Sequence, residues 1–206
     1  MSPQTFILFG RSGAGKGTQA ALLCDYLRKT DPGRGVIYIE TGAKFREFMT
    51  GSSHTSRLTK AVLDKGGLLP EFLPIWLWTD ILVRDFTGAE HLVLDGLSRR
   101  QNEAPILAGA LAFYGRPRPF VVVLEVSRRW AEEHLMSRGR KDDTIEQVRR
   151  RLDWFDQNVL PTIEFFKKRA DYTVVEVNGE QAAPKVHEDI IKACFGSLSG
   201  ITASAG

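Results

Sequence analysis

The sequence predicts an α/β fold in which a five-stranded parallel sheet is flanked by helices. Three features lead to this prediction: five short apolar runs rich in β-branched residues, longer segments with helical spacing between them, and a glycine-rich loop directly after the first run. Strands buried on both faces read as continuous apolar runs, and alternation of strands with helices is typical of a parallel sheet. With 206 residues the chain is long enough for one such domain with small insertions.

The five apolar runs define the expected strands. They are residues 6–9, 36–39, 91–94, 120–126 and 173–177. Residues 41–90 connect the second strand to the third, which is more chain than one crossover helix requires, so we expect a small helical insertion over residues 41–85. The small, polar residues 196–206 are expected to be a disordered tail after a single domain of residues 1–195.

The clearest helix is expected to start near Asp142 or Asp143, because Asp143 and Glu146 have the spacing of a capping pair. Apolar residues then recur every three or four positions, which predicts a stripe that packs into the core. This stripe consists of Ile145, Val148, Leu152, Phe155, Val159, Ile163 and Phe166.

The overall composition is that of an ordinary globular protein, with 43% hydrophobic and 26% charged residues. A net charge of +3 suits a small polyanionic ligand as well as it suits nucleic acid. The two cysteines, Cys24 and Cys194, make a disulfide framework or a cysteine-built zinc site unlikely from their number alone and favour a reducing compartment. The sequence has no basic leader and no long apolar segment, so we expect a cytoplasmic protein without a membrane span.

A phosphate-binding loop is indicated by Gly10-Arg11-Ser12-Gly13-Ala14-Gly15-Lys16, which satisfies the pattern G-x-x-x-x-G-K. The pattern lies between an expected strand and an expected helix, which is the context that gives it meaning. Glycines let backbone N–H groups converge on a phosphate chain, the following helix presents its positive end, and Lys16 supplies a cation. The sequence therefore predicts a nucleoside triphosphate ligand.

The residue after Lys16 is Gly17, followed by Thr18, so the position that usually offers a hydroxyl to Mg²⁺ has no side chain. Carboxylates and waters must then hold the metal. Asp95, at the end of the third expected strand, is the nearest good candidate, and we expect it to bind Mg²⁺ through water.

The order Gly-Lys-Gly-Thr in "GKGTQ" resembles the nucleoside monophosphate kinases, above all the adenylate kinases. Four further segments resemble motifs of that family in the same order: "ETGAKFREF", "GGLLPEF", "VLDGLSRRQNEA" and "SRGRKDDTIEQVRRRL". The resemblance spans roughly residues 6–180. It implies a P-loop kinase core with a monophosphate-binding insertion and a short lid over residues 137–143.

The resemblance also implies which residues act. The ATP site would comprise Gly13, Ala14, Gly15, Lys16, Gly17, Thr18 and Arg138. The AMP site would comprise Thr41, Gly42, Arg46, Gly67, Leu68, Leu69, Gly96, Arg99, Glu103, Arg140 and Arg151. The catalytic residues would be Lys16, Asp95, Arg99, Arg138, Arg140 and Arg151. This set fits phosphoryl transfer, which needs alignment and cations rather than a nucleophilic triad.

Three departures from the family pattern stand out. The usual prolines are replaced by Ser12 and Ser98, which we expect to loosen the backbone only slightly. The glutamine that pairs with adenine is replaced by Glu103, whose ionised carboxylate would suit guanine better. The lid is very short, and without cysteines it has no zinc.

We therefore expect an ATP- and Mg²⁺-dependent adenylate kinase, without zinc, that converts ATP and AMP into two ADP. The alternatives are a kinase for guanosine or pyrimidine monophosphates, a P-loop kinase for another small acceptor, and a nucleic-acid-binding or regulatory P-loop protein. We expect no nucleic-acid or membrane partner and a monomer. An oligomer is the alternative, because a neighbouring subunit, or the insertion with Trp76 and Trp78, would have to help the short lid exclude water.

Overall fold

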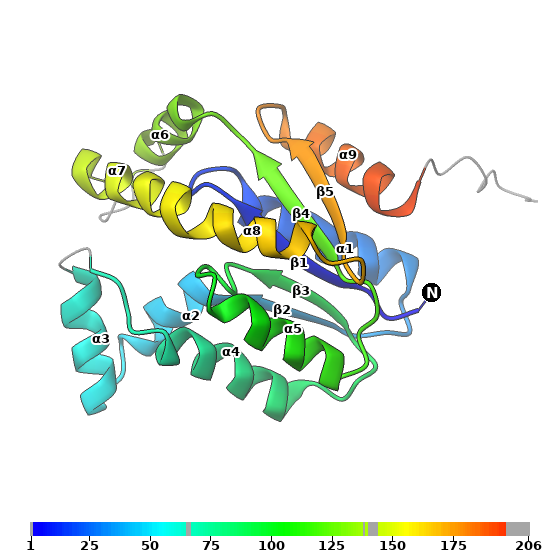
Figure 1. The fold of residues 1–206 in the computed structure, drawn as a ribbon, viewed down its shortest axis with the longest axis horizontal. Coiled ribbons are helices and arrows are strands. Elements are labelled where there is room, and N and C mark those ends of the chain that lie inside the picture. Colours follow the sequence, from blue (N-terminus) through cyan, green and yellow to red (C-terminus); the bar gives the residue numbers. More distant parts are fainter. Residues whose placement is uncertain (1, 65–66, 138, 140–143, 197–206) are drawn as a thin grey trace, which may run out of the picture.

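The computed structural model describes residues 2–64, 67–137, 139 and 144–196 (Figure 1). Its five strands form one parallel sheet in the order β2-β3-β1-β4-β5. The strands are β1 (Thr5–Gly10), β2 (Val36–Glu40), β3 (His91–Asp95), β4 (Phe120–Glu125) and β5 (Thr173–Asn178). The predicted fold class is confirmed, and each strand coincides with one of the five apolar runs.

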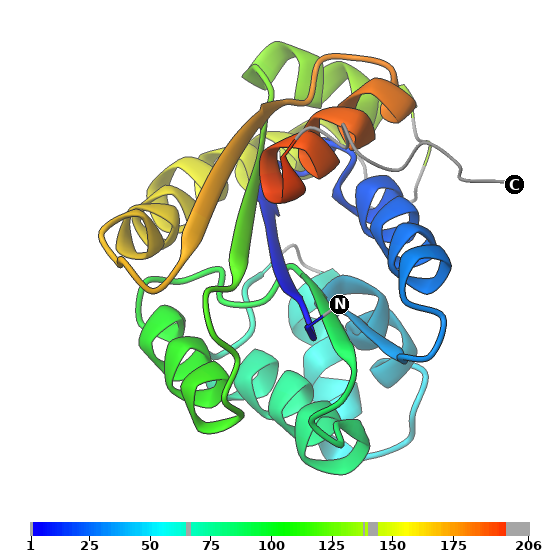
Figure 2. The same ribbon diagram turned by 90° about the vertical axis from the view of Figure 1, so that its right-hand side faces the viewer.

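Helices cover both faces of this sheet, as Figure 2 shows in a view turned by 90°. Successive residues of β1 point to opposite faces, so that Phe6 and Leu8 join one core while Ile7 and Phe9 join the other. The first core also takes residues from α1 (Lys16–Thr30), α6 (Arg128–Ser137), α7 (Ile145–Trp154) and α9 (Ala183–Phe195). The second takes residues from α4 (Phe72–Asp85), α5 (Glu103–Phe113) and α8 (Leu160–Lys167).

The long connection between β2 and β3 contains α2 (Thr41–Phe48), α3 (His54–Asp64) and α4. A small core of its own joins these helices, built from Phe45, Leu69, Leu73 and Leu77. Of the two tryptophans on α4, Trp78 is fully buried in the second core and is a packing residue. Trp76 stays 44% exposed, with its ring 5.4 Å from that of Phe48.

The helix that the sequence predicts near Asp142 or Asp143 begins later than expected. The prediction of a cap at Asp143 was wrong: α7 begins at Ile145, and the Thr144 side chain accepts the cap hydrogen bond from the N–H of Gln147 at 3.3 Å. Asp142 and Asp143 lie outside the described residues. Ile145 is 54% exposed, so the buried stripe starts one turn later than expected.

A π-helical segment, η1 (Phe155–Val159), joins α7 to α8, and Figure 1 shows the three as one continuous rod. The rod passes from one core to the other: Val148 and Leu152 pack in the first, whereas Phe155 and Val159 pack in the second. A π turn contains an extra residue and often marks a functional site. The predicted stripe is therefore buried from Val148 onward, but it serves two cores.

The chain crosses from β3, on one side of β1, to β4 on the other side. In open α/β sheets such a reversal creates a crevice outside the carboxyl ends of the strands, where ligands bind. The carboxyl ends of β1, β2 and β3 meet there, since Asp95 pairs in register with Leu8 and with Glu40. Among the described residues, no helix has the length and apolarity that crossing a membrane demands.

His91, the first residue of β3, is fully buried beside the start of β1. Its Nδ1 accepts a hydrogen bond from the N–H of Gln4 at 2.9 Å, and its Nε2 lies 3.4 Å from the Asp31 carboxylate. Burial lowers the pKa of His91, and Arg34 and Arg116 lower it further, while Asp31 opposes them. The folded protein therefore favours the neutral ring.

This burial predicts a pH-dependent loss of stability. Because the unfolded chain binds the His91 proton more readily, the free energy of unfolding falls as pH drops below about 6.5. In His91→Asn the amide oxygen replaces Nδ1, so that part of the pH dependence disappears. Urea unfolding at about pH 7.5 and about pH 5 measures the difference. The exposed His54→Asn is the control and keeps the wild-type dependence; a His91→Asn variant that also kept it would contradict the prediction.

Candidate active site

The loop between β1 and α1 is shaped by glycines in left-handed conformations. Gly13 has φ +89° and Gly15, the N-cap of α1, has φ +84°, which residues with a Cβ adopt only with strain. A Cβ at Gly13 would also lie 2.8 Å from the carbonyl oxygen of Ala131 in α6. The loop thus packs closely under α6 and leads directly to the first N–H groups of α1, which suits it to bind an anion.

Lys16 is the first residue of α1, and its side chain lies back across the loop. Its Nζ donates to the carbonyl oxygens of Gly10 at 2.8 Å and Arg11 at 3.0 Å. Ala14 is buried, whereas Gly17 and Thr18 are exposed in the first turn of α1. A Cβ at Gly17 would meet nothing within 4 Å, so packing does not force the loss of a hydroxyl there.

Asp95 ends β3 and is only 5% exposed. Burial raises the pKa of its carboxyl, and the positive charges of Lys16 and Arg99 oppose that shift. Its neighbour in register, Glu40, raises the pKa further. The positive charges of Lys16 and of the predicted phosphate arginine, Arg99, therefore both favour the ionised form of this buried carboxylate.

A second cluster forms around the carbonyl oxygen of Gly96, the residue after Asp95. Thr41 Oγ1 donates to this oxygen at 2.8 Å, and Arg99 Nε donates to it at 3.1 Å. Arg46, on the exposed side of α2, pairs with the Glu40 carboxylate at 3.1 Å. Three of the predicted monophosphate residues, Thr41, Gly96 and Arg99, are thus hydrogen-bonded together, and a fourth, Arg46, lies on the helix that Thr41 begins.

Glu103, the first residue of α5, is 3% exposed, and its Oε2 accepts a hydrogen bond from the backbone N–H of Arg99 at 2.8 Å. The side chain thereby holds the loop that carries Arg99. Burial raises the pKa of Glu103, while the hydrogen bond from Arg99 lowers it. Its expected role in reading the base stays a prediction.

Ser98 occupies one of the positions where the family usually has proline. Its φ is +56°, whereas a proline ring holds φ near −65°. The exchange is therefore more than a slight loosening, because the loop before α5 follows a path that no proline allows. This path places the Arg99 N–H against Glu103.

The remaining predicted residues are dispersed. A Cβ at Gly67 would touch Val62 at 3.0 Å, Leu69 is buried with the small core of the insertion, and Leu68 is 52% exposed. Arg151 lies on α7, where its Nε donates to the Gln147 carbonyl at 3.3 Å. Gly42 is the second residue of α2. Arg138 and Arg140 lie outside the described residues.

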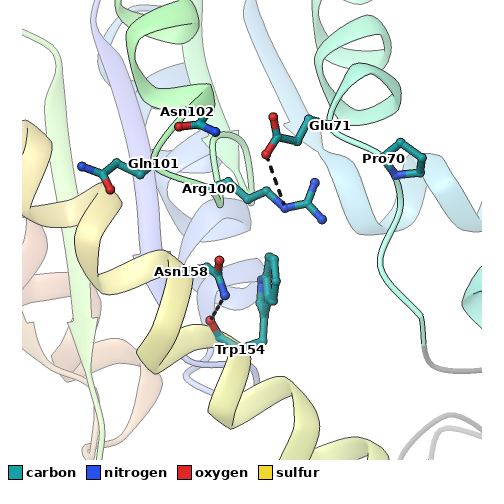
Figure 3. A pocket seen from close by; sticks show the side chains of 7 residues that line it. All are labelled: Pro70, Glu71, Arg100, Gln101, Asn102, Trp154 and Asn158. Carbon is teal, nitrogen blue, oxygen red and sulfur yellow. Dashed lines mark hydrogen bonds and ion pairs between the residues drawn. The ribbon is translucent and has the colours of Figure 1, made fainter.

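A pocket of about 570 Å³ lies between the start of α4, the loop before α5 and the part of the rod where α7 joins η1 (Figure 3). Arg100 extends into it, with its Nε 4.0 Å from the Glu71 carboxylate and its guanidinium 5.0 Å from the centre of the Trp154 ring. The other lining residues are Pro70, Gln101, Asn102 and Asn158. The pocket therefore separates the insertion from the rod that carries Arg151.

Sequence reasoning missed several charged residues around the site. Glu40 pairs with Arg46, and Arg11 pairs with Asp156 at 2.7 Å. Arg11 occupies a variable position of the loop pattern, so the pattern gives no reason to single it out. The one feature that could have drawn attention to Arg11 is its positive charge within the glycine-rich loop. Among the described residues, no set of three or more His, Cys, Asp or Glu side chains is arranged to hold a metal ion.

The Gly96 cluster predicts that replacing Gly96 by a residue with a Cβ lowers the stability of the protein. Gly96 has φ +78°, and a Cβ there would lie 2.6 Å from Arg99 Nη2 and 2.8 Å from Thr41 Oγ1. Gly96→Ala therefore combines backbone strain of about 1–2 kcal/mol with an overpacking cost of about 1–3 kcal/mol. Gly88→Ala is the matched control, because Gly88 has φ +96° and open space around it. Urea unfolding measures both; equal losses would show that the clash is relieved without cost.

Comparison with known proteins agrees with this geometry. A family model described as adenylate kinase matches residues 8–171. Adenylate kinase 1 of Nostoc sp. is 31% identical over 191 residues, covering 93% of this chain and 98% of the relative. Adenylate kinase of Stenotrophomonas maltophilia is 30% identical (92% and 98% covered), and that of Corynebacterium aurimucosum is 34% identical (84% and 94% covered). The chain therefore belongs to the adenylate kinase family.

Proposed function

We propose that this protein is an adenylate kinase that reversibly transfers the γ-phosphoryl group of ATP to AMP, giving two ADP. One observation carries the proposal: the glycine-rich loop with Lys16 and the Gly96 cluster with Arg99 follow the adjacent parallel strands β1 and β3, beside the buried carboxylate of Asp95. Two elements that we propose bind phosphate would thus face one crevice. Family membership and the names of the relatives support the same reaction.

In the proposed reaction, N–H groups of the glycine-rich loop and of the first turn of α1 hold the triphosphate. Lys16 exchanges its contacts with Gly10 and Arg11 for phosphate oxygens. Thr41, Arg46 and Arg99 bind the acceptor phosphate, Arg138 binds the triphosphate, and Arg140 and Arg151 neutralise the charge on the group being transferred. No general base is required, because an ionised phosphate oxygen is already a nucleophile.

Asp95 is proposed to hold Mg²⁺ through water. The carboxylate of Asp95 suits this role, because Mg²⁺ prefers carboxylate oxygens and water as ligands. Asp95 also lies at the end of β3, where the charge of Lys16 acts on it. When bound, Mg²⁺ would neutralise charge on the β- and γ-phosphate oxygens. The open space at Gly17 leaves room for water on that side of the loop.

We further propose a cytoplasmic monomer organised as one kinase domain over residues 1–195, with the monophosphate-binding insertion at 41–85 and a short lid at 137–143. A lid of this length leaves much of the exclusion of water to the insertion and to the rod, which face each other across the pocket at Arg100. ATP hydrolysis without acceptor would then stay well below phosphotransfer.

The acceptor is tested directly by ADP release in a coupled assay with ATP and a panel of AMP, GMP, CMP, UMP and dTMP. We expect the largest kcat/KM with AMP, and ATP turnover without acceptor slower by about tenfold or more. A preference for GMP above about tenfold, equal to about 1.4 kcal/mol, would contradict the choice of AMP. Absence of transfer to every monophosphate would favour a kinase for another small acceptor.

The role of Glu103 predicts a pH-dependent choice of base. A protonated carboxyl donates and accepts as an amide does and suits adenine, whereas the ionised form only accepts and suits guanine. Because burial raises the pKa of Glu103, protonation persists to higher pH than for an exposed glutamate. The ratio of kcat/KM for AMP to that for GMP should therefore fall as pH rises from about 5 to about 8.5.

Glu103→Gln is the matched control for this effect, because its amide donates and accepts at every pH. We expect a higher AMP preference in this variant and a ratio that no longer changes with pH. If the variant had the same AMP-to-GMP ratio as the wild type at every pH, this side chain would hold Arg99 but not read the base.

A further inference from the structure

The side chain of Arg11 leaves the glycine-rich loop and is anchored on the residue after β4 and on η1. Its Nη1 donates to the Val126 carbonyl at 2.8 Å, just after β4, and its Nη2 donates to the Asp156 carboxylate at 2.7 Å. Its guanidinium lies over the Phe155 ring, 4.9 Å from the centre. A planar guanidinium held at several points has a defined orientation, unlike a flexible ammonium group.

The backbone of the same residue holds the phosphate-binding lysine. The carbonyl oxygen of Arg11 accepts hydrogen bonds from Lys16 Nζ at 3.0 Å and from the Ala14 N–H at 3.0 Å. Arg11 therefore contacts Lys16 through its main chain and Asp156 through its side chain. One residue therefore links the loop that carries Lys16 to η1.

At the other end of this contact, Asp156 is the second residue of η1 and lies five positions after Arg151. Helix α7 and η1 follow each other without interruption, so the two residues belong to one rod. Asp156 also lies 3.5 Å from Arg128, at the start of α6, which pairs with Asp153 at 2.7 Å. The contact between Arg11 and Asp156 thus links the glycine-rich loop to the rod.

We propose that Arg11 is a positioning residue for phosphoryl transfer, whose pair with Asp156 fixes the rod bearing Arg151 relative to the loop bearing Lys16. This inference rests on the proposed function, in which both cations contact the transferred group. A displacement of about 1 Å between groups that align a reaction can cost about a hundredfold in rate. The side chains are only 23% and 37% exposed, so solvent screens this pair less than a fully exposed one.

The test compares Arg11→Ala, Asp156→Ala and the double variant in the ADP-release assay with ATP and AMP. Each single change should lower kcat by about tenfold to a hundredfold, while KM for AMP changes by less than about twofold. The double variant should be no slower than the slower single variant, because both changes remove one interaction. Multiplied losses would overturn the pairing, and an unchanged kcat in Arg11→Ala would overturn the positioning role.

Two conservative variants and one control separate positioning from folding. Arg11→Lys keeps the charge but loses the two-pronged contact, so its kcat should lie between the wild type and Arg11→Ala; Asp156→Asn keeps an acceptor and should behave likewise. Arg128→Ala removes the other partner of Asp156 and should keep kcat within about twofold. An equal loss in Arg128→Ala would assign the effect to general stability, and thermal unfolding of each variant checks the fold. A wild type inactive with every monophosphate would instead contradict the proposed function.

Discussion

The site depends on a backbone turn that must lead from a buried strand into a helix while leaving N–H groups free for an anion. The first turn of any α-helix has such N–H groups, but they bind a phosphate only if the preceding chain does not cover them. Gly13 and Gly15 meet this condition with positive φ angles. Because β1 is the central strand, the ends of β3 and β4 flank this turn and supply its neighbours, Asp95 and Val126.

The buried carboxylate of Asp95 organises the charges around that turn. Alone, a carboxylate that is 5% exposed would be strongly destabilised in its ionised form. Lys16 and Arg99 counter this, and each comes from a different element that is proposed to bind phosphate. Electrostatics therefore favours keeping both cations near this carboxylate, which reduces the reorganisation that the proposed phosphoryl transfer would require.

Most of the fold was predictable because strands of a buried parallel sheet are apolar wherever they occur. Local details were not, since they depend on packing. Asp143 and Thr144 are both of residue types that favour the N-cap, so residue type alone does not show that Thr144 makes the cap hydrogen bond. The apolar stripe has the same spacing through η1 as in an α-helix, so the π turn could not be predicted from the sequence. Ser98 and Glu103 were recognised as departures, but the positive φ of Ser98 and the burial of Glu103 follow from tertiary contacts.

The arginines that are expected to bind the acceptor phosphate already have partners within the protein, and the strength of these pairs decides how they would respond to phosphate. Arg46 is 49% exposed and its partner Glu40 is 32% exposed, so this pair contributes no more than about 1 kcal/mol. A phosphate dianion offers more charge and a bidentate geometry, and therefore displaces the carboxylate. Arg99 is different: its Nε and backbone N–H are held by Gly96 and Glu103. We infer that Arg99 presents a preformed site, and that Arg46 turns from Glu40 to complete it.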